Sequence, residues 1–186
     1  LLGMLNGDNY QMIFSDTPGI IETSYELQNT MMSYVKKSLI DSDLILYMVG
    51  NKNKDLINEN IQLLVKKTKL KLFIVINKID LMSQDEVNDS INYWKDKYDP
   101  FDIIPISALN KYNIDVLLNK IINVLPDSPP YFPKDILTDR NLRFIISEIV
   151  REKIFKRYSK EIPYSSEVVI HSYKEKEKIV DISCVI

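Results

Sequence analysis

The sequence has few of the residues on which several classes of protein depend. Its 186 residues include one cysteine, one histidine and four glycines. The single cysteine excludes an internal disulfide framework and favours a reducing compartment. Because His171 is the only histidine, this chain cannot form a metal site with several histidine ligands. Cys184 lies in an apolar run, so we expect a buried strand thiol there.

Long apolar runs and a strong excess of one charge are also absent. No stretch approaches the length of a membrane span, and no basic start followed by an apolar core indicates a signal peptide. The net charge is -2, so any surface that binds nucleic acid must be local. The chain begins with Leu1 rather than Met, and we expect a fragment or a numbering that starts inside a longer protein.

What is present is an alternation of strands and helices. Asn6-Gly7 between two short apolar runs predicts an opening hairpin. Apolar runs then predict strands, the first two buried on both faces, over 43–50, 71–78 and 101–107. Periodic apolar positions predict helices over 25–40, 55–69, 84–98 and 113–125. This order predicts an α/β fold, with a mainly parallel sheet and helices on both faces.

The composition changes at residues 126–135, where four prolines occur in ten residues. Such a stretch cannot continue a helix and is typical of a semi-rigid linker. An amphipathic helix over 140–158 follows, with Thr138 or Asp139 as its expected cap, and then two strands. We therefore expect a first domain over 1–126, a linker over 127–138 and a second domain over 139–186.

Three loops follow predicted strands, at the sheet edge where ligands bind in such folds. The first is Asp16-Thr17-Pro18-Gly19. Asp16 could hold Mg²⁺ through a water molecule, because hard cations take oxygen ligands. Gly19 would let a backbone N–H approach a terminal phosphate closely. Alone, this motif is better explained as an ordinary Pro-Gly turn.

The second loop is Asn77-Lys78-Ile79-Asp80 and the third is Ser107-Ala108-Leu109. A carboxylate at Asp80 can accept hydrogen bonds from the guanine N1–H and exocyclic amine, a pair that adenine does not offer. Asn77 can hold the loops together, and the Lys78 stem can lie over the ring face. A backbone N–H of the third loop can meet the guanine carbonyl. Alone, the second loop could merely cap the next helix, and the third is almost uninformative.

In this order and position, the three loops resemble motifs of translation-factor-like GTPases. The resemblance assigns the first loop to switch II, the second to guanine specificity and the third to its support, with GTP or GDP and Mg²⁺ as cofactors. Ile20 stands where Ras-like enzymes have a glutamine that orients the attacking water. Since isoleucine cannot do this, the sequence predicts slow intrinsic hydrolysis and names no certain catalytic residue.

The second half of the chain resembles the Era family of ribosome-assembly GTPases. Three motifs carry the resemblance: Thr138–Arg140, Ser147–Lys153 and Glu161–Ser165. It implies a truncated GTPase domain over 1–126 and the start of a type II KH domain over 139–186. It also implies binding of 16S-like small-subunit rRNA and a role in assembly of the 30S subunit. No glycine here is followed by lysine, so a phosphate-binding P-loop is absent, as is the GxxG clamp of KH domains. We expect this segment alone to be inactive.

The resemblance leaves several expectations and alternatives. Candidate RNA-binding residues are Arg140, Arg143, Lys156 and Arg157, for which a solvated helix face with ion pairs is the alternative. The resemblance implies a monomer in the bacterial cytoplasm, with peripheral association at the inner membrane; an organelle matrix stays open. The competing functions are a non-catalytic RNA-binding scaffold with an incomplete GTPase domain, and another GTPase of the same superclass.

Overall fold

The computed structural model describes residues 1–18, 26–50, 70–159, 161–162 and 164–186. The helix expected over 55–69 lies outside these residues. The chain forms two compact units, one made of Leu1–Asp16 with Tyr131–Ile186 and the other of Thr17–Pro130. The predicted domain boundaries at 126 and 138 stay predictions.

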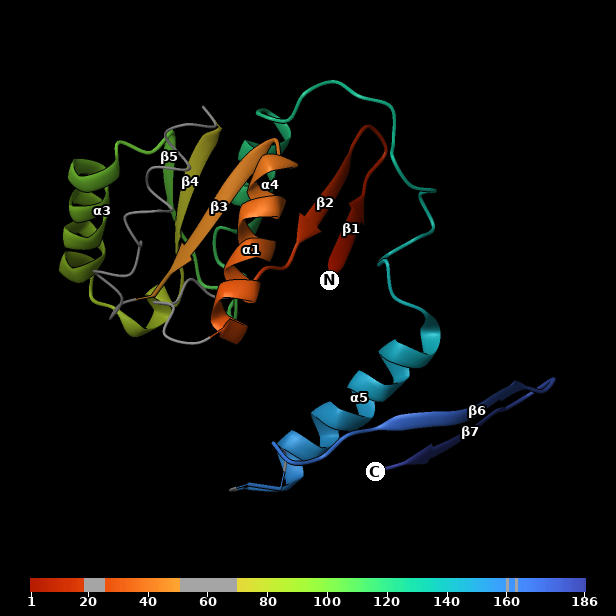
Figure 1. Cartoon of the computed structure of the whole chain (residues 1–186). Coiled ribbons are helices and arrows are strands. Elements are labelled where there is room, and N and C mark those ends of the chain that lie inside the picture. Colours follow the sequence, from red (N-terminus) through yellow and green to blue (C-terminus); the bar gives the residue numbers. More distant parts are fainter. Residues whose placement is uncertain (19–25, 51–69, 160, 163) are drawn as a thin grey trace. The chain divides into compact units, whose positions relative to one another are not determined.

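The unit Thr17–Pro130 is built on a parallel sheet. Its strands lie in the order β3 (Leu44–Val49), β4 (Lys71–Ile76) and β5 (Asp102–Pro105). The helices of this unit are α1 (Glu26–Ile40), α3 (Gln84–Tyr98) and α4 (Ile114–Ile122). Helices α3 and α4 lie on opposite sides of the sheet (Figure 1). The predicted α/β fold with a parallel sheet is confirmed.

The core of this unit is centred on β4, which has a neighbouring strand on each side. Phe73, Ile74, Val75 and Ile76 have exposed fractions of 0%. Helix α3 brings Trp94 against the same cluster, where its ring lies 5.8 Å from that of Tyr47. The position of β4 is therefore fixed, and with it the point at which the following loop begins.

Strand β3 differs from the prediction that it is buried on both faces. Only Val49 is buried, and Met48 is 58% exposed. Among the described strands β3 pairs with β4 alone, so one of its edges has no strand beside it. The prediction failed because an apolar run shows what a strand could bury, and its neighbours decide what it does bury.

Helix α3 begins and ends where the sequence predicts. The Ser83 hydroxyl accepts a hydrogen bond from the Glu86 N–H, while the Glu86 carboxylate accepts one from the Ser83 N–H. This reciprocal capping box satisfies two free donors of the first turn. Asp99, in the left-handed region, ends the helix. The helix thus begins at Gln84, four residues after Asp80, and its capped first turn fixes the chain that follows this loop.

The other unit begins with the predicted hairpin. Strands β1 (Leu2–Asn6) and β2 (Gln11–Ser15) pair antiparallel, with Gly3 opposite Phe14. The proline-rich segment 126–135 contains no helix, as predicted, and the chain after it is bonded to this hairpin: Thr138 forms an antiparallel bridge with Gly3. Residues 131–139 therefore belong to the same unit as the hairpin.

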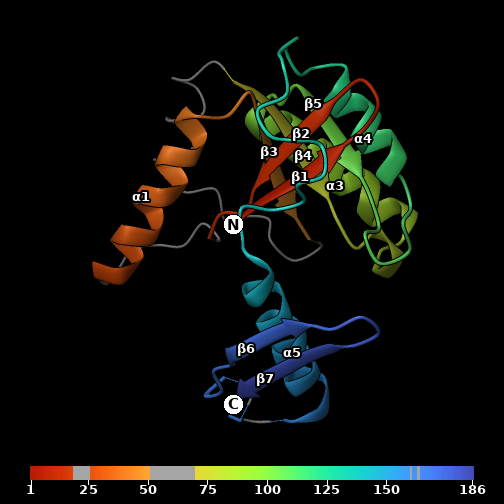
Figure 2. The same cartoon turned by 90° about the vertical axis from the view of Figure 1, so that its right-hand side faces the viewer.

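A helix and two antiparallel strands complete this unit, in the order that the Era resemblance implies. They are α5 (Leu142–Arg157), β6 (Val169–Glu175) and β7 (Val180–Val185), and Figure 2 shows the strand pair against the helix. The expected cap at Thr138 or Asp139 was wrong. Asn141 caps α5 by accepting a hydrogen bond from the Phe144 N–H, because Thr138 and Asp139 are bonded to Leu2 instead.

The expectation of a buried thiol at Cys184 was also wrong. Every residue of β7 is exposed, and Cys184 with them. In the described part of the chain β7 pairs only with β6, so its other edge has no strand beside it. No described helix has the length and apolar character needed to cross a membrane.

Candidate nucleotide-binding site

The site begins where β4 and β5 end side by side. Ile76 lies opposite Pro105 in the parallel register, so the loops that follow leave the sheet together. The Asn77 N–H donates to the Val49 carbonyl at 2.7 Å, and the Ile79 N–H donates to the Ile106 carbonyl at 3.2 Å. These backbone bonds tie the loop 77–80 to both neighbouring strands.

The side chain of Asn77 joins this loop to the loop 107–109. Its Oδ1 accepts hydrogen bonds from the N–H of Lys78 at 2.8 Å and from the N–H of Ala108 at 3.0 Å. Its Nδ2 lies 3.6 Å from the sulfur of Met48. The Ala108 N–H is therefore engaged with Asn77, and the expectation that a backbone N–H of the third loop meets the guanine carbonyl stays a prediction.

Asp80 and Ser107 form the second connection between the loops. The buried Ser107 hydroxyl donates to Asp80 Oδ1 at 2.6 Å, although 27 residues separate the two. An ionised carboxylate offers about four acceptor positions on its two oxygens, and Ser107 occupies one. The exposed Asp80 is therefore held in one orientation with acceptor capacity left for a pair of donors on a ligand.

The backbone of Lys78 makes a sharp turn at the centre of the loop. Its φ is 65° and its ψ 36°, in the left-handed region that residues other than glycine rarely adopt. This turn leads into the short 3₁₀ helix η1 (Ile79–Leu81), which carries Asp80. The Lys78 side chain is exposed, as the predicted role over a base requires, and Leu109 in the other loop is 85% exposed.

Three residues that were not predicted from the sequence support the loop 107–109. Tyr112 exchanges two backbone hydrogen bonds with Ser107, at 3.0 and 3.2 Å. The Asn110 N–H donates to the Ser107 hydroxyl oxygen, and Asn113 Nδ2 donates to the Pro105 carbonyl. Asparagines at turns were the available signal, since their side chains bond nearby backbone and tolerate positive φ, as Asn113 does at 59°.

The loop that begins at Asp16 belongs partly to the other compact unit. Asp16 follows β2, donates its N–H to the Leu1 carbonyl at 2.9 Å and is exposed. Thr17 is exposed and Pro18 half-buried, while Gly19 and Ile20 lie outside the described residues. Within the described residues, no three side chains of the metal-binding types come together. A single exposed carboxylate fits a magnesium ion held through water, the role predicted for Asp16.

The four candidate RNA-binding residues do not form one surface. Arg140 lies over the Phe144 ring at 5.2 Å, and Lys156 is bonded to Glu152. At 100° per residue, Arg143 and Arg157 lie within about 40° of each other around α5, whereas Lys156 lies about 140° away from Arg143. The hydrogen bond from Lys156 lowers the pKa of the Glu152 carboxyl.

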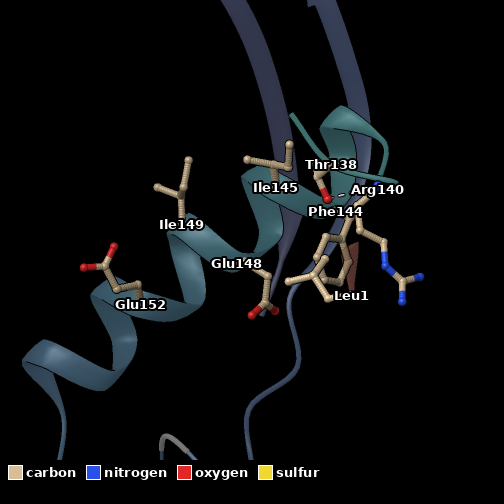
Figure 3. Close-up of a pocket in the computed structure, with 8 residues that line it drawn as sticks. All are labelled: Leu1, Thr138, Arg140, Phe144, Ile145, Glu148, Ile149 and Glu152. Atoms are coloured by element: carbon tan, nitrogen blue, oxygen red, sulfur yellow. Dashed lines mark hydrogen bonds between the residues drawn. The ribbon is translucent and has the colours of Figure 1, made fainter. Parts of the chain in front are cut away.

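The face of α5 that carries Lys156 also carries an open apolar groove of about 430 Å³. Figure 3 shows Ile145 and Ile149 along it, with the carboxylates of Glu148 and Glu152 beside them. Acidic and apolar side chains do not favour a phosphate backbone, so this face is the less suitable of the two for RNA. Arg143 and Arg157 are on the more suitable side.

Residues 4–127 match the family described as the Elongation factor Tu GTP binding domain. The chain belongs to this family. The matched residues include Asp16 and both loops that Asn77 joins. The prediction that the three loops are those of a GTP-binding domain agrees with membership of this family.

The Era resemblance is confirmed over nearly the whole chain. The chain is 36% identical to the GTPase Era of Thermoanaerobacter sp. (strain X514) in an alignment of 192 positions that covers 99% of this chain and 62% of that protein. It is 37% identical to the GTPase Era of Syntrophus aciditrophicus (strain SB), covering 95% of this chain and 58% of that one. The chain thus spans about three fifths of the curated relatives that it matches.

Two solved structures of Era match the fold closely. One is a complex of Era with MgGDPNP and nucleotides 1506–1542 of 16S ribosomal RNA; its TM-score is 0.83, with 35% identity, 98% of this chain and 64% of that chain covered. The other is a variant of Aquifex aeolicus Era bound to GDP·AlF4⁻, with a TM-score of 0.82, 35% identity and the same coverage of both chains. These matches include the segment from 131 onward, which the family domain does not cover.

Proposed function

We propose that the chain is part of an Era-type GTPase. The parent protein binds GTP and GDP with Mg²⁺, converts GTP and water to GDP and phosphate, and binds small-subunit rRNA during assembly of the 30S subunit. The observation that carries the proposal is the pair of side-chain bonds between the two loops, Ser107 to Asp80 and Ala108 to Asn77. We also propose a monomer in the bacterial cytoplasm, as the Era resemblance implies.

The base pocket selects guanine through hydrogen-bond direction. Asp80 accepts from the N1–H and exocyclic amine of guanine, and adenine presents no such pair of donors. Because the Ser107 hydroxyl already holds Oδ1, the carboxylate does not have to be ordered when the nucleotide binds. Asn77 joins the loop 107–109 to the loop 77–80, so the two connected loops recognise the base together.

The phosphate end of the site uses Asp16 and the backbone that follows it. Mg²⁺ neutralises charge that develops on the phosphate oxygens during transfer. Asp16 would hold the ion through a water molecule, and its own backbone is fixed by the bond to Leu1. Hydrolysis is slow without a partner, because Ile20 cannot orient a water molecule by hydrogen bonding.

The RNA-binding part of the proposal rests on α5 and the antiparallel pair that follows it. The related Era structure that contains 16S rRNA nucleotides matches 98% of this chain, including these elements. Among the basic candidates, Arg143 and Arg157 share one side of α5, away from the carboxylates of the groove. These two residues are the more favourable phosphate contacts.

The test is Asp80→Asn in the full-length protein. The amide cannot accept both guanine donors, so we expect GTP affinity to fall by about 100-fold, since each hydrogen bond to a charged group contributes about 1.5–3 kcal/mol. Xanthosine triphosphate should bind better than to the unmodified protein, because the amide donates to the second carbonyl of xanthine. Asp96→Asn, on the exposed side of α3, is the matched control. Equal GTP affinity in Asp80→Asn would overturn the base pocket, and no guanine-nucleotide binding by the unmodified protein would favour the RNA-binding scaffold.

A further inference from the structure

Residues 131–139, the strap, are hydrogen-bonded along the hairpin formed by β1 and β2. At one end the side chain of Gln11 acts as a clasp: Oε1 accepts from the N–H groups of Tyr131 and Phe132 at 2.8 and 3.0 Å. Its Nε2 donates to the Phe132 carbonyl at 2.9 Å and to Asn6 Oδ1 at 2.8 Å. One amide therefore satisfies three backbone groups of the strap.

The opposite end of the strap is attached to β1. The Met4 N–H donates to the Leu137 carbonyl at 2.8 Å, and the Thr138 hydroxyl donates to the Leu2 carbonyl at 2.8 Å. The Leu2 N–H donates to Asp139 Oδ1 at 2.9 Å, which lowers the pKa of that carboxyl. The strap thus extends the hairpin as a third, irregular strand.

Polar contacts, more than apolar burial, hold the strap in place. Tyr131 is 77% exposed and Leu137 is 72% exposed, while Phe132 and Ile136 are half-buried. In the middle, Lys134 donates to the carbonyls of Gly7 and Asp8 at 3.0 and 2.8 Å, on the turn of the hairpin. Since no residue of the strap is fully buried, detachment of the strap removes no residue from a hydrophobic core.

The position of the strap connects two functional segments. Strand β2 runs directly into Asp16, at the start of the proposed phosphate-sensing loop. The strap ends at Asp139, two residues before Asn141, which caps the proposed RNA-binding helix α5. A displacement of β2 moves the Gln11 amide, and the strap must either follow it or lose its hydrogen bonds.

We propose that the strap couples the guanine-nucleotide state to the RNA-binding helix, with Gln11 as the positioning residue. This inference rests on the proposed function, because it assigns the route by which the same nucleotide site regulates RNA binding. Neither the three loop motifs nor the base pocket requires Gln11. Its role is to hold the strap in one register on the hairpin.

The experiment uses the full-length protein and two variants of the strap contact. Gln11→Ala removes the clasp, and Thr138→Val removes the hydroxyl bond to Leu2 while keeping the shape of the side chain. Gln84→Ala, an exposed glutamine in the first turn of α3, is the matched control. Affinity for an RNA fragment equivalent to nucleotides 1506–1542 of 16S rRNA is measured with GDP and with GDPNP. Amide hydrogen exchange at Met4 reports whether the strap is docked at the end away from Gln11.

We expect Gln11→Ala to leave GTP affinity within about twofold and to bring the ratio of the two RNA affinities close to one, with Thr138→Val in between. Exchange at Met4 should rise at least about fivefold in Gln11→Ala, because the strap detaches as a unit. Nucleotide-dependent RNA binding that persists unchanged in both variants would overturn the coupling alone. The coupling is also overturned if the unmodified protein binds nucleotide but shows equal RNA affinity in both states. No nucleotide binding at all would overturn the proposed function as well, and Met4 exchange would still report strap docking.

Discussion

Strands β4 and β7 are both mainly apolar in sequence but differ in their surroundings. From Phe73 to Ile76, β4 is fully buried, whereas every residue of β7 is exposed. Strand β4 has a hydrogen-bonded neighbour on each side, while β7 pairs with β6 alone among the described strands. The comparison shows that burial is a property of position in the sheet, and it predicts where substitutions are costly.

The largest expected effect tests the difference in burial between β4 and β7 directly. Ile74→Ala removes a fully buried side chain from β4 and should lower the free energy of unfolding by about 3–4 kcal/mol, as cavity-forming substitutions do. Ile182→Ala, the same substitution at a β7 position that is 44% exposed, should cost less than about 1 kcal/mol. Urea unfolding of the two variants measures both. Equal costs would mean that β7 is covered in solution.

A smaller effect tests whether the loss of a helix cap costs the same in both units. Ser83→Ala and Asn141→Ala each remove the side-chain cap of a helix, α3 in one unit and α5 in the other. Each should cost about 1 kcal/mol, because a cap is a local bond that does not depend on the depth of the core. Thermal unfolding provides the measurement. Ser147→Ala, inside α5, is the control and should be close to neutral; a cost as large as that of Asn141→Ala would remove the capping explanation.

The smallest effect on stability at neutral pH comes from a difference in titration between two tyrosines. Burial, with a smaller contribution from Tyr98, raises the pKa of Tyr47 to about 12, while the hydrogen bond to Glu175 raises the pKa of Tyr173. Folded Tyr47 keeps its proton where the unfolded chain, with a pKa near 10, has lost it. Its contribution to stability is therefore unchanged below about pH 10 and falls as the pH rises from about 10 to 12.

Tyrosinate absorbance, resolved with Tyr47→Phe and Tyr173→Phe, separates the two causes. Glu175→Gln should bring the pKa of Tyr173 back toward its ordinary value and leave that of Tyr47 raised. Tyr47→Phe should flatten the decline in stability at high pH. An unchanged Tyr173 pKa in Glu175→Gln would show that its surroundings, rather than the hydrogen bond, cause the shift.

Much of the fold could be predicted because its signals are local. The hairpin follows from Asn6-Gly7, and the start of α3 follows from Ser83 with Glu86 three residues later. Features that depend on a distant partner could not be predicted. The exposure of Cys184 depends on which layers cover β7, and the cap of α5 changed because Asp139 bonds to Leu2.

The same distinction applies to the candidate site. Asn77 and Asp80 were predicted from one short motif, and the structure places them together with Ser107; their roles in binding guanine stay predictions. The direction of the Ala108 N–H and the supporting bond from Asn113 were missed, because each depends on how two loops from different strands meet. Spacing in the sequence places loops at one edge, and side-chain geometry then decides which groups are left for a ligand.

The exposure of β7 makes the chain suitable for a fluorescence measurement. Cys184 is the only cysteine of these 186 residues and is exposed, whereas Trp94 is the only tryptophan and is 1% exposed. A thiol-reactive dye would therefore attach to one known position in one compact unit without disturbing a core. The indole in the other unit, enclosed by Tyr47, Tyr93 and Tyr98, supplies an intrinsic fluorescence donor. The chain thus carries a natural donor and a single attachment point for an acceptor, so energy transfer between Trp94 and a dye on Cys184 can be measured.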